Sequence, residues 1–243
     1  MKFKYSAAPQ LSEEWIGLGM GVVTASNLYR WEAVSKKDGV TPLKARADYE
    51  KELMFERQFN QTFSKFVSGA MRDGTEFEAF ARKEYERVTG NTVEEVGCWY
   101  NEFFRASPDG NVKEPNIKDP QGHLEIKWLK DTNWTEVLLT KKPYVSNGQA
   151  DHWKQCQGQM FASGLKWTDY AACNETTGKM IIIRVFPDKE YFKSLEASLK
   201  QPIVMEKFDL DGVHEIGDPI AEKDLTVDPI EKPTITKDEL KDF

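Results

Sequence analysis

The stretch GHLEIKW at 122–128 limits the fold of this chain more than any other. In a β-strand, residues two apart point to the same side, so Glu125 and Lys127 are presented together. A Pro-Asp-Gly sequence at 108–110 precedes this segment and is separated from it by a polar loop. If the two segments pair as neighbouring strands, Asp109 comes to lie beside Glu125. A hairpin with a charged, solvated loop is the alternative interpretation.

Two carboxylates and a lysine in this order favour a specific chemistry. Carboxylates held close together repel each other unless a hard cation lies between them, and oxygen ligands of this kind select Mg²⁺ or Mn²⁺. Such a cation lowers the pKa of a bound water and polarises a phosphoryl oxygen. Lys127 would orient the attacking water or neutralise the scissile phosphate. The pattern therefore predicts phosphodiester hydrolysis, although each residue taken alone has an ordinary structural explanation.

The remaining sequence predicts an α/β (α+β) fold with a mixed central β-sheet flanked by helices. Apolar residues recur at helical spacing in 71–90, which we expect to form a helix that stops at Gly90. Thr24, Ala25 and Ser26 follow a glycine-rich approach, and Ser26 is expected to cap a helix. Further helices are expected at about 42–67, 148–164 and 188–201, and strands at 91–110, 122–128 and 167–186.

The acidic charge of the chain is confined to its C-terminal end. The sequence carries 33 basic and 40 acidic side chains, a net charge of −7. Residues 205–243 hold 12 acidic and 5 basic side chains, which accounts for the whole excess. We therefore expect a nuclease domain at 1–204 and an acidic tail at 205–243 that is extended or disordered. A balanced domain with local lysine clusters can still present a positive groove to DNA.

The sequence disfavours both a membrane segment and a cysteine-bound cluster. A membrane helix needs roughly 18 to 20 apolar residues, and neither such a run nor the apolar stretch of a signal peptide is found. We therefore expect a cytoplasmic protein without a membrane partner. Cys98, Cys156 and Cys173 are widely spaced and form no C-x-x-C motif. They are expected to be reduced packing residues and not disulfides or iron–sulfur ligands.

Asp109, Glu125 and Lys127 fit the pattern of the PD-(D/E)xK nuclease superfamily. The segments SPDG at 107–110 and LEIKW at 124–128 resemble in particular the bacteriophage lambda exonuclease and YqaJ-type viral recombinase nucleases. Further segments that resemble this family, in the same order, are GVVTAS at 21–26, DGTEFEAFAR at 73–82 and QCQGQM at 155–160.

The resemblance covers roughly residues 13 to 190 and implies both a fold and an activity. The implied fold is the restriction-endonuclease-like core of the superfamily. The implied activity is that of a Mg²⁺-dependent 5′-to-3′ exonuclease, with Mn²⁺ as a substitute, which degrades one strand of double-stranded DNA from its ends. The implied setting is phage-type recombination, with a ring-shaped homotrimer and a single-strand annealing protein as partner. For a viral protein, this setting is the cytoplasm of the bacterial host.

The resemblance also implies roles for individual residues. The expected metal ligands are Asp109, Glu125, the Ile126 carbonyl and Glu78, the last near a second metal or its water. The residues expected to position the nucleophile are Lys127 and Gln157. The residues expected at the 5′ phosphate or the DNA are Thr24, Ser26, Ser107, Gln155, Arg105 and Arg30. Without the family, Glu78 would be interpreted as a solvated helix charge and Gln157 as an interior amide.

One position departs from the family pattern. Lambda exonuclease holds the 5′ phosphate with an arginine before its TAS segment, and the matching position here is Gly19. Arg105 and Arg30 are the candidates to replace that arginine, and Arg105 shares strand parity with Ser107 and Asp109. Unless one of them does so, we expect a weaker preference for 5′-phosphorylated ends.

Two other classes of function stay open. Another nuclease with the same core, such as a restriction endonuclease or a RecB-like single-strand nuclease, would carry the same catalytic residues. Iron–sulfur versions are excluded because the chain lacks four clustered cysteines. A catalytically inactive DNA-binding module would keep the fold, but the complete set of Asp109, Glu125 and Lys127 argues against it. Closed circular DNA distinguishes an exonuclease from an endonuclease with the same core, because only the exonuclease requires a DNA end.

Overall fold

The computed structural model describes residues 1–39, 41–63, 69–146 and 150–201, with the backbone alone for 69–76. Its helices are α1 Glu13–Gly17, η1 Ala25–Asn27 (a 3₁₀ turn), α2 Leu28–Trp31, α3 Lys44–Phe59, α4 Gly69–Thr89, α5 Asp131–Thr140, α6 His152–Ser163 and α7 Lys189–Leu199. Its strands are β1 Lys4–Ser6, β2 Val23–Thr24, β3 Thr92–Glu94, β4 Cys98–Tyr100, β5 Phe104–Ala106, β6 Gly110–Lys113, β7 Gly122–Leu129, β8 Val145–Ser146, β9 Ala150–Asp151, β10 Thr168–Asn174 and β11 Met180–Val185. The acidic tail predicted at 205–243 lies outside the described residues.

The larger sheet has the strand order β11-β10-β7-β6-β3. β7 and β10 run parallel, with Glu125 opposite Tyr170. β6 pairs antiparallel with β7, and β11 pairs antiparallel with β10. A parallel pair needs a long crossover connection, which here contains α5 and α6. The mixed sheet flanked by helices that the sequence predicts is therefore confirmed.

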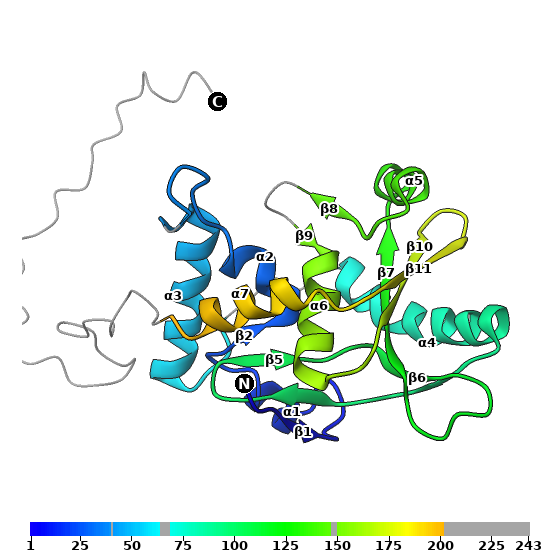
Figure 1. The fold of residues 1–243 in the computed structure, drawn as a ribbon, viewed down its shortest axis with the longest axis horizontal. Coiled ribbons are helices and arrows are strands. Elements are labelled where there is room, and N and C mark those ends of the chain that lie inside the picture. Colours follow the sequence, from blue (N-terminus) through cyan, green and yellow to red (C-terminus); the bar gives the residue numbers. More distant parts are fainter. Residues whose placement is uncertain (40, 64–68, 147–149, 202–243) are drawn as a thin grey trace, which may run out of the picture. The chain divides into compact units, whose positions relative to one another are not determined.

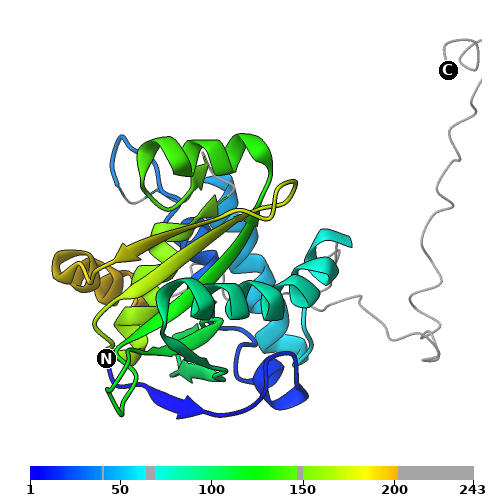
Figure 2. The same ribbon diagram turned by 90° about the vertical axis from the view of Figure 1, so that its right-hand side faces the viewer.

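Helices cover both faces of this sheet. Leu124 and Ile126 of β7 pack against Ala81 and Tyr85 of α4 in one apolar cluster. Residues of α5 and α6 form a second cluster around Tyr170 on the other face. In Figure 1 the strands lie between α6 and α4, and in Figure 2 α4 crosses in front of the sheet. Because side chains alternate along β7, its charged residues face α6.

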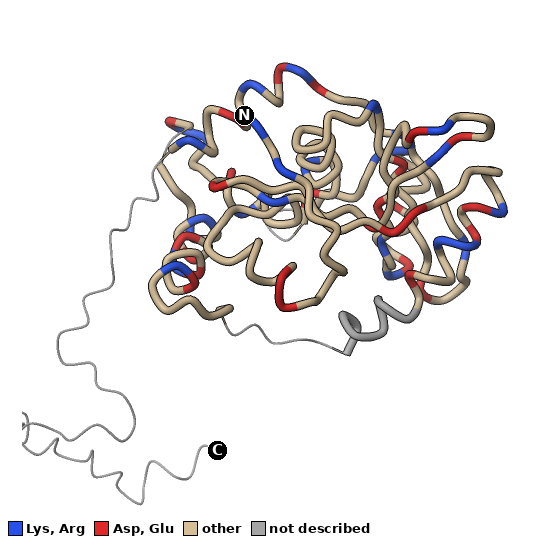
Figure 3. Tube along the Cα trace, turned by 90° about the horizontal axis from the view of Figure 1, so that it is seen from below, with Lys and Arg blue, Asp and Glu red and all other residues tan. Residues whose placement is uncertain are grey.

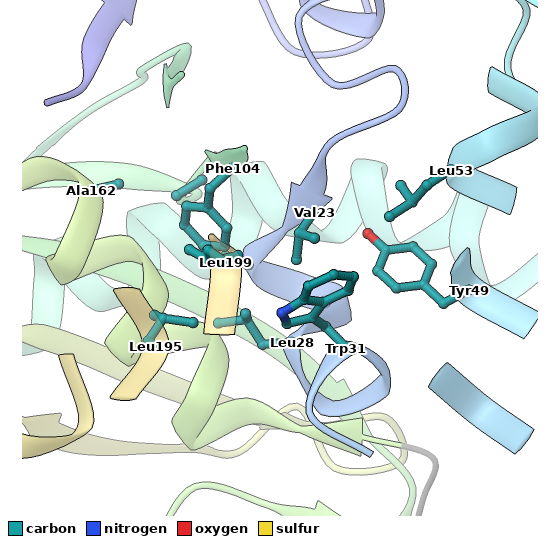
Figure 4. Packing of buried hydrophobic residues seen from close by; sticks show 11 residues of the cluster. Val23, Leu28, Trp31, Tyr49, Leu53, Phe104, Ala162, Leu195 and Leu199 are labelled. Atoms are coloured by element: carbon teal, nitrogen blue, oxygen red, sulfur yellow. The ribbon is translucent and has the colours of Figure 1, made fainter. Parts of the chain in front are cut away.

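The smaller sheet, with the order β1-β4-β5-β2, lies on its own apolar cluster. Trp31, Tyr49, Phe104 and Leu195 come from four different elements and are almost completely buried there (Figure 4). Burial of a side chain of this kind contributes about 1.5 to 3 kcal/mol to folding. The Tyr49 hydroxyl accepts a hydrogen bond from the Thr24 amide at 3.1 Å. The cluster thereby fixes the chain where β2 passes into η1.

Two segments connect the sheets. The chain leaves β5 at Ala106 and enters β6 at Gly110, so residues 107–109 pass from the smaller sheet to the larger one. α6 packs against strands of both sheets. A Cβ atom at Gly158 would lie 2.8 Å from Leu28 Cδ1, so the glycine allows α6 to approach α2 closely. Through α6, these contacts connect the TAS segment to β7, the strand that carries Glu125 and Lys127.

Most predicted elements are present, with shifted ends. The helix expected at 71–90 is α4, which ends at Thr89, and the helix expected at about 42–67 is α3, which ends at Phe59. Ser26, which we expected to cap a helix, lies inside η1, and no side chain caps α2 at its start. The prediction for Ser26 was therefore wrong. The TAS segment is a tight turn whose position depends on the core beneath it.

Charge, cysteines and hydropathy can be compared with the sequence expectations over the described ranges. Acidic and basic positions are interspersed along the trace in Figure 3. Cys98, Cys156 and Cys173 are buried and free, as expected. In these ranges no helix has the length and apolar character needed to cross a membrane.

Candidate active site

Glu125 lies at the centre of the site and is completely buried. Its Oε1 accepts hydrogen bonds from Lys127 Nζ and, at 2.6 Å, from Gln155 Nε2. Its Oε2 accepts a hydrogen bond from Gln159 Nε2. A buried carboxylate is costly unless it is paired and hydrogen-bonded, and these three donors meet that requirement. The strand pattern that predicted Glu125 and Lys127 on one side of the sheet is confirmed.

Asp109 lies beside Glu125 because β6 pairs with β7. The Asp109 amide donates a hydrogen bond to the Leu124 carbonyl at 3.0 Å. Its Oδ2 accepts a hydrogen bond from the Ile126 amide at 2.6 Å. The pairing on which the sequence prediction depended is therefore present. The structure brings Asp109, Glu125 and Lys127 together.

The electrostatics of the site are those of two crowded carboxylates. Burial, followed by the negative charge of Glu125, raises the pKa of Asp109 well above its usual range. Burial alone would lower the pKa of Lys127, but the Glu125 and Asp109 carboxylates outweigh it and raise that pKa. Lys127 therefore stays charged, whereas an ionised Asp109 calls for a further positive charge nearby.

The donor set fits a hard divalent cation. Asp109 and Glu125 supply carboxylate oxygens, and the Ile126 carbonyl is the expected third oxygen. Mg²⁺ is usually held by one or two carboxylates, with water and substrate phosphates around it, so a closed protein cage is not required. In the described ranges no group of three or more His, Cys, Asp or Glu side chains is placed to hold a metal. A cation would also relieve the repulsion that raises the pKa of Asp109.

Glu78 reaches the site from α4. Its Oε1 accepts a hydrogen bond from Arg82 at 2.6 Å, and Arg82 also bonds to the Asp109 carbonyl at 3.2 Å. Burial, opposed by Arg82 and reinforced by Glu125, raises the pKa of Glu78. Glu78, Arg82, Glu95 and Asp109 line a cavity of about 440 Å³. The structure thus places Glu78 near the catalytic carboxylates, with its own carboxylate bonded to an arginine.

The three glutamines of α6 divide between two places. Gln155 and Gln159 are four residues apart on the helix and both donate to the Glu125 carboxylate. Gln157 bonds elsewhere, donating to the Phe186 carbonyl at 2.8 Å and accepting from a backbone amide of the next loop at 2.9 Å. Residues two apart on a helix face different directions. Gln157, which we expected to position the nucleophile, is thus bonded to backbone groups away from Glu125, and Gln159 is the residue that shares the Glu125 carboxylate with Gln155.

A smaller cavity, of about 160 Å³, lies beside the carboxylates, and we call it the small pocket. It is lined by Gln10, Trp15, Thr24, Ala25, Ser26, Arg105, Ser107 and Gln155. Most residues expected at a terminal phosphate are thus gathered in one place. Gln155 joins the two sites, because it lines the small pocket and also bonds to Glu125.

The hydroxyl groups of the small pocket are held by neighbouring segments. Ser107 Oγ accepts a hydrogen bond from Trp15 Nε1 at 3.0 Å and donates one to the Gly97 carbonyl at 2.7 Å. The hydroxyl oxygens of Thr24 and Ser26 lie 3.3 Å apart. Packing between α1, η1 and the β5–β6 link therefore sets the shape of the pocket.

Arg30 does not line the small pocket. Its guanidinium donates two hydrogen bonds to Glu52, at 2.7 and 2.8 Å, and lies 4.7 Å from the centre of the Tyr49 ring. It is committed to the packing of α2 on α3. Of the two arginines proposed to replace one at Gly19, the structure therefore places only Arg105 at the pocket, and the expectation for Arg30 is corrected.

Comparison with known proteins agrees with this geometry. Residues 14–166 match the model of the YqaJ-like viral recombinase domain, which is more than half of the chain. The chain belongs to the YqaJ-like viral recombinase family. No curated protein matches it significantly.

Solved structures resemble this YqaJ-like chain in fold. The alkaline exonuclease LHK-Exo of Laribacter hongkongensis is 28% identical, with a TM-score of 0.64 over 77% of this chain and 89% of that chain. The complex of LHK-Exo with dAMP gives the same values. A phage-related exonuclease of Haemophilus somnus 129PT is 12% identical, with a TM-score of 0.55 over 73% of this chain and 90% of that chain. At 12% identity, the likeness to the Haemophilus somnus exonuclease concerns the fold alone.

Several residues of the YqaJ-like site received no role from the sequence, among them Gln10, Trp15, Arg82 and Gln159. Gln10 lines both cavities and donates a hydrogen bond to the Pro108 carbonyl at 3.0 Å. Helical spacing was the signal for Gln159, because a residue four positions after Gln155 shares its side of the helix. Gln10 and Trp15 gave no such signal, since both reach their partners across some ninety residues of sequence.

Proposed function

We propose that this YqaJ-like protein is a Mg²⁺-dependent 5′-to-3′ exonuclease that degrades one strand of double-stranded DNA from its ends. Family membership and the likeness to LHK-Exo support a nuclease that acts on DNA. The observation that carries the proposal is the position of Asp109 beside Glu125, with Lys127 bonded to Glu125. Mn²⁺ is the expected substitute because it has similar ligand preferences.

The residues of the site divide the work of hydrolysis. A divalent cation bound at the carboxylates would lower the pKa of the attacking water and neutralise charge on the phosphate. Lys127 is charged and its side chain is 27% exposed, so its Nζ can reach the attacking water or the scissile phosphate. Gln155 and Gln159 hold the Glu125 carboxylate in one orientation, which reduces the rearrangement needed during the reaction.

The polarity of the proposed reaction depends on the small pocket. A pocket for one terminal group, placed next to the catalytic carboxylates, admits a strand end and positions the next phosphodiester for hydrolysis. Gln155 contacts Glu125 from the wall of that pocket, so the two places are adjacent. The likeness to LHK-Exo, which has been solved with dAMP, supports a site of mononucleotide size.

We further propose a closed ring of three copies and a single-strand annealing protein as partner. A ring around the duplex would prevent dissociation between successive cleavage steps, and cyclic symmetry is the usual way to close such an assembly. Light scattering of the full chain at working concentration is expected to give the mass of three copies. A monomer that degrades long DNA without dissociating would contradict the ring.

Digestion of end-labelled DNA tests the exonuclease proposal. Linear duplexes labelled at the 5′ or at the 3′ end, and a closed circular duplex, are incubated with the full chain in Mg²⁺, in Mn²⁺ and in excess chelator. The 5′ label is expected to be released first, as a mononucleotide, and the circle is expected to stay intact. Cleavage of the circle would indicate an endonuclease. Earlier release of the 3′ label would reverse the polarity, and unchanged digestion in chelator would contradict the metal requirement.

A further inference from the structure

The cavity of about 440 Å³ that contains Glu78 and Asp109 has two unlike walls, and we call it the carboxylate cavity. One wall is polar and carries the side chains of Glu78, Arg82, Glu95 and Asp109. The other wall comes from the N-terminal segment and is lined at every second position by Tyr5, Ala7, Pro9 and Leu11. The cavity volume lies within the range of about 300 to 1,000 Å³ that small-molecule sites have. One hydrated cation would fill only part of that space, because a water molecule takes up about 30 Å³.

Leu11 differs from the rest of this apolar wall, because its backbone is strained and its side chain is exposed. It is the third residue of the Pro9–Ser12 turn, which the Ser12 amide closes by donating to the Pro9 carbonyl at 3.1 Å. Its φ of 69° is a value at which glycine or asparagine is usual, since a Cβ atom is crowded there. The side chain is 67% exposed, so burial within the chain does not compensate for the strain. A single exposed leucine is ordinary on a protein surface, but a strained one beside the proposed catalytic carboxylates indicates a use.

The turn is held at a fixed place relative to Asp109. The Gln10 side chain donates a hydrogen bond to the carbonyl of Pro108, the residue before Asp109, at 3.0 Å. On the other side of the turn, Ser12 Oγ accepts a hydrogen bond from the Trp15 amide at 3.2 Å and caps α1. The whole apolar wall lies before residue 14, where the match to the family model begins. Membership of the family therefore does not account for this wall.

A nucleobase fits the chemistry of the two walls. Its faces are apolar and its edges carry hydrogen-bonding groups, so it can contact an apolar surface while its edges meet polar groups or water. If a phosphodiester is bound at Asp109, the sugar and base next to it reach this cavity. Contact with the face of a base tolerates any sequence, because every base has a π-face. Such contact suits an enzyme that removes one nucleotide after another.

We propose that Leu11, presented by the Pro9–Ser12 turn, binds the base of the nucleotide that is being removed. The proposal rests on the exonuclease function proposed above and adds to it a contact for the departing base. The base lies against Leu11 and the neighbouring side chains of the apolar wall. The strained backbone then serves to present an apolar side chain to the DNA and not to the core.

The test compares duplexes in which the 5′-terminal nucleotide of the degraded strand carries its base or is abasic. A tetrahydrofuran residue serves as the abasic nucleotide, and all duplexes carry a 5′ phosphate. The measured quantity is the ratio of the single-turnover rates at which the intact and the abasic terminal nucleotides are released. For the native chain this ratio is expected to be about fivefold to hundredfold. Fraying of the abasic end affects all variants equally, so the comparison between variants isolates the contact.

Leu11→Asn is expected to lower this ratio at least about threefold, because it removes the apolar contact and suits the backbone conformation. Leu11→Met is expected to keep the ratio, since methionine is apolar and adaptable. Leu139→Asn is the matched control, because Leu139 is 77% exposed on α5 and lines neither cavity of the site. An unchanged ratio in Leu11→Asn would overturn the proposal. An effect that appears only with the abasic residue at the second position would overturn it as well, because Leu11 would then contact a base that remains on the DNA.

The same variant is expected to have the opposite effect on stability. Asparagine tolerates a positive φ better than leucine, so Leu11→Asn should raise the midpoint of thermal unfolding by about 2 to 4 °C. A variant that is more stable than the native chain cannot owe its lower ratio to unfolding. A lower midpoint would show that Leu11 supports the fold, and would overturn the claim that it is kept for contact with DNA.

The outcomes separate this inference from the proposed function. If the native chain degrades the intact duplex from its 5′ end and Leu11→Asn keeps the native ratio, the inference is wrong while the exonuclease stands. If the native chain degrades neither duplex in Mg²⁺ or Mn²⁺, the exonuclease proposal fails. Calorimetric titration with dAMP and with deoxyribose 5-phosphate then still tests Leu11. Tighter binding of dAMP that is lost in Leu11→Asn would support the inference, and equal binding of both compounds by the native chain would overturn it.

Discussion

The catalytic centre and the small pocket share Gln155 but are built in opposite ways. The centre places two carboxylates beside one lysine, an arrangement that suits the divalent cation that we propose there. The pocket surrounds one guanidinium with neutral donors and has no carboxylate in its lining, so it is prepared for an anion. Gln155, a neutral amide, lies between the two and bonds to Glu125. A metal ion at the carboxylates and a terminal phosphate in the small pocket could therefore be bound side by side, because the neutral Gln155 side chain separates the carboxylates from the guanidinium.

The two sites also differ in how firmly their residues are held. Glu125 lies in the interior of a sheet and has three donors on its carboxylate. Ser26 of the pocket is exposed, and its hydroxyl contacts only that of Thr24 among the described residues. We infer that changes in the catalytic centre abolish the chemistry, whereas changes in the pocket alter the choice of DNA end.

The largest effect is expected from Lys127→Ala, and Asp109→Ala is expected to act similarly. Each should lower the cleavage rate about a hundredfold to a thousandfold or more, because a charge positioned at the reacting group is removed. DNA binding should change little, since phosphate contacts elsewhere supply most of the affinity. Single-turnover cleavage and mobility shift measure the two quantities. Lys130→Ala, at an exposed position just after β7, is the matched control; a near-native rate for Lys127→Ala would mean that the site is misplaced.

A pair of variants tests whether Gln159 and Gln157, which face different directions from α6, affect the reaction rate and the stability, respectively. Gln159→Leu removes a donor from Glu125 and is expected to lower kcat about tenfold to hundredfold and to raise the Mg²⁺ concentration needed for half-maximal rate. Gln157→Leu leaves a carbonyl and an amide of the β11–α7 loop without partners. It should lower the free energy of unfolding by about 1 to 3 kcal/mol, with kcat nearly unchanged. Urea unfolding measures the stability and steady-state kinetics measures kcat. A larger decrease of kcat in Gln157→Leu than in Gln159→Leu would contradict this assignment.

A smaller effect is expected from Ser26→Ala in the pocket. A neutral hydroxyl contributes about 0.5 to 1.5 kcal/mol to binding, which corresponds to about a twofold to tenfold change in the ratio of 5′-phosphate to 5′-hydroxyl rates. The rate on the 5′-hydroxyl duplex should stay nearly the same. If Ser26→Ala lowered both rates equally, the pocket would belong to the chemistry and the contrast between the two sites would fail.

The last effect concerns stability and not the reaction, and it depends on His123, which lies on the same side of β7 as Glu125 and Lys127 and is completely buried. Its ring nitrogens bond to Asn111 at 2.9 Å and to Ser163 at 2.7 Å. Burial lowers the pKa of His123 to about 3, from an ordinary value of 6.5. The unfolded chain therefore takes up a proton below about pH 6.5, whereas the folded chain does not until about pH 3.

Stability should consequently fall as the pH is lowered through this window. Between pH 7 and pH 5 this histidine is expected to remove about 2 kcal/mol from the free energy of unfolding. Urea unfolding of the native chain and of His123→Gln at both pH values isolates the contribution. The variant should be less stable at pH 7 and should lose less on acidification. Equal losses in both proteins would show that His123 is protonated in the folded chain.

The success of the sequence predictions follows the range of the interactions involved. Asp109, Glu125 and Lys127 were predicted correctly to converge, because the strand period of two and one hairpin are local properties. Gln157 was predicted at the catalytic carboxylates because it belongs to the Q-x-Q motif. Its helical spacing of two residues from Gln155 directs its side chain elsewhere. The failed cap prediction for Ser26 has another cause, since the turn at η1 is shaped by the core and not by a capping bond.

By itself, then, the sequence determined the mixed α/β fold, the convergence of Asp109, Glu125 and Lys127, and the family. Only the tertiary structure decided which arginine enters the small pocket. Arg30 and Arg105 were equivalent candidates by charge, and they were separated by their partners, since Glu52 takes the first and Trp15 the second. The space over Gly19 is likewise defined by a residue on a distant strand. Local spacing carries the geometry of a strand pair, but a cavity forms only where segments far apart in sequence pack together.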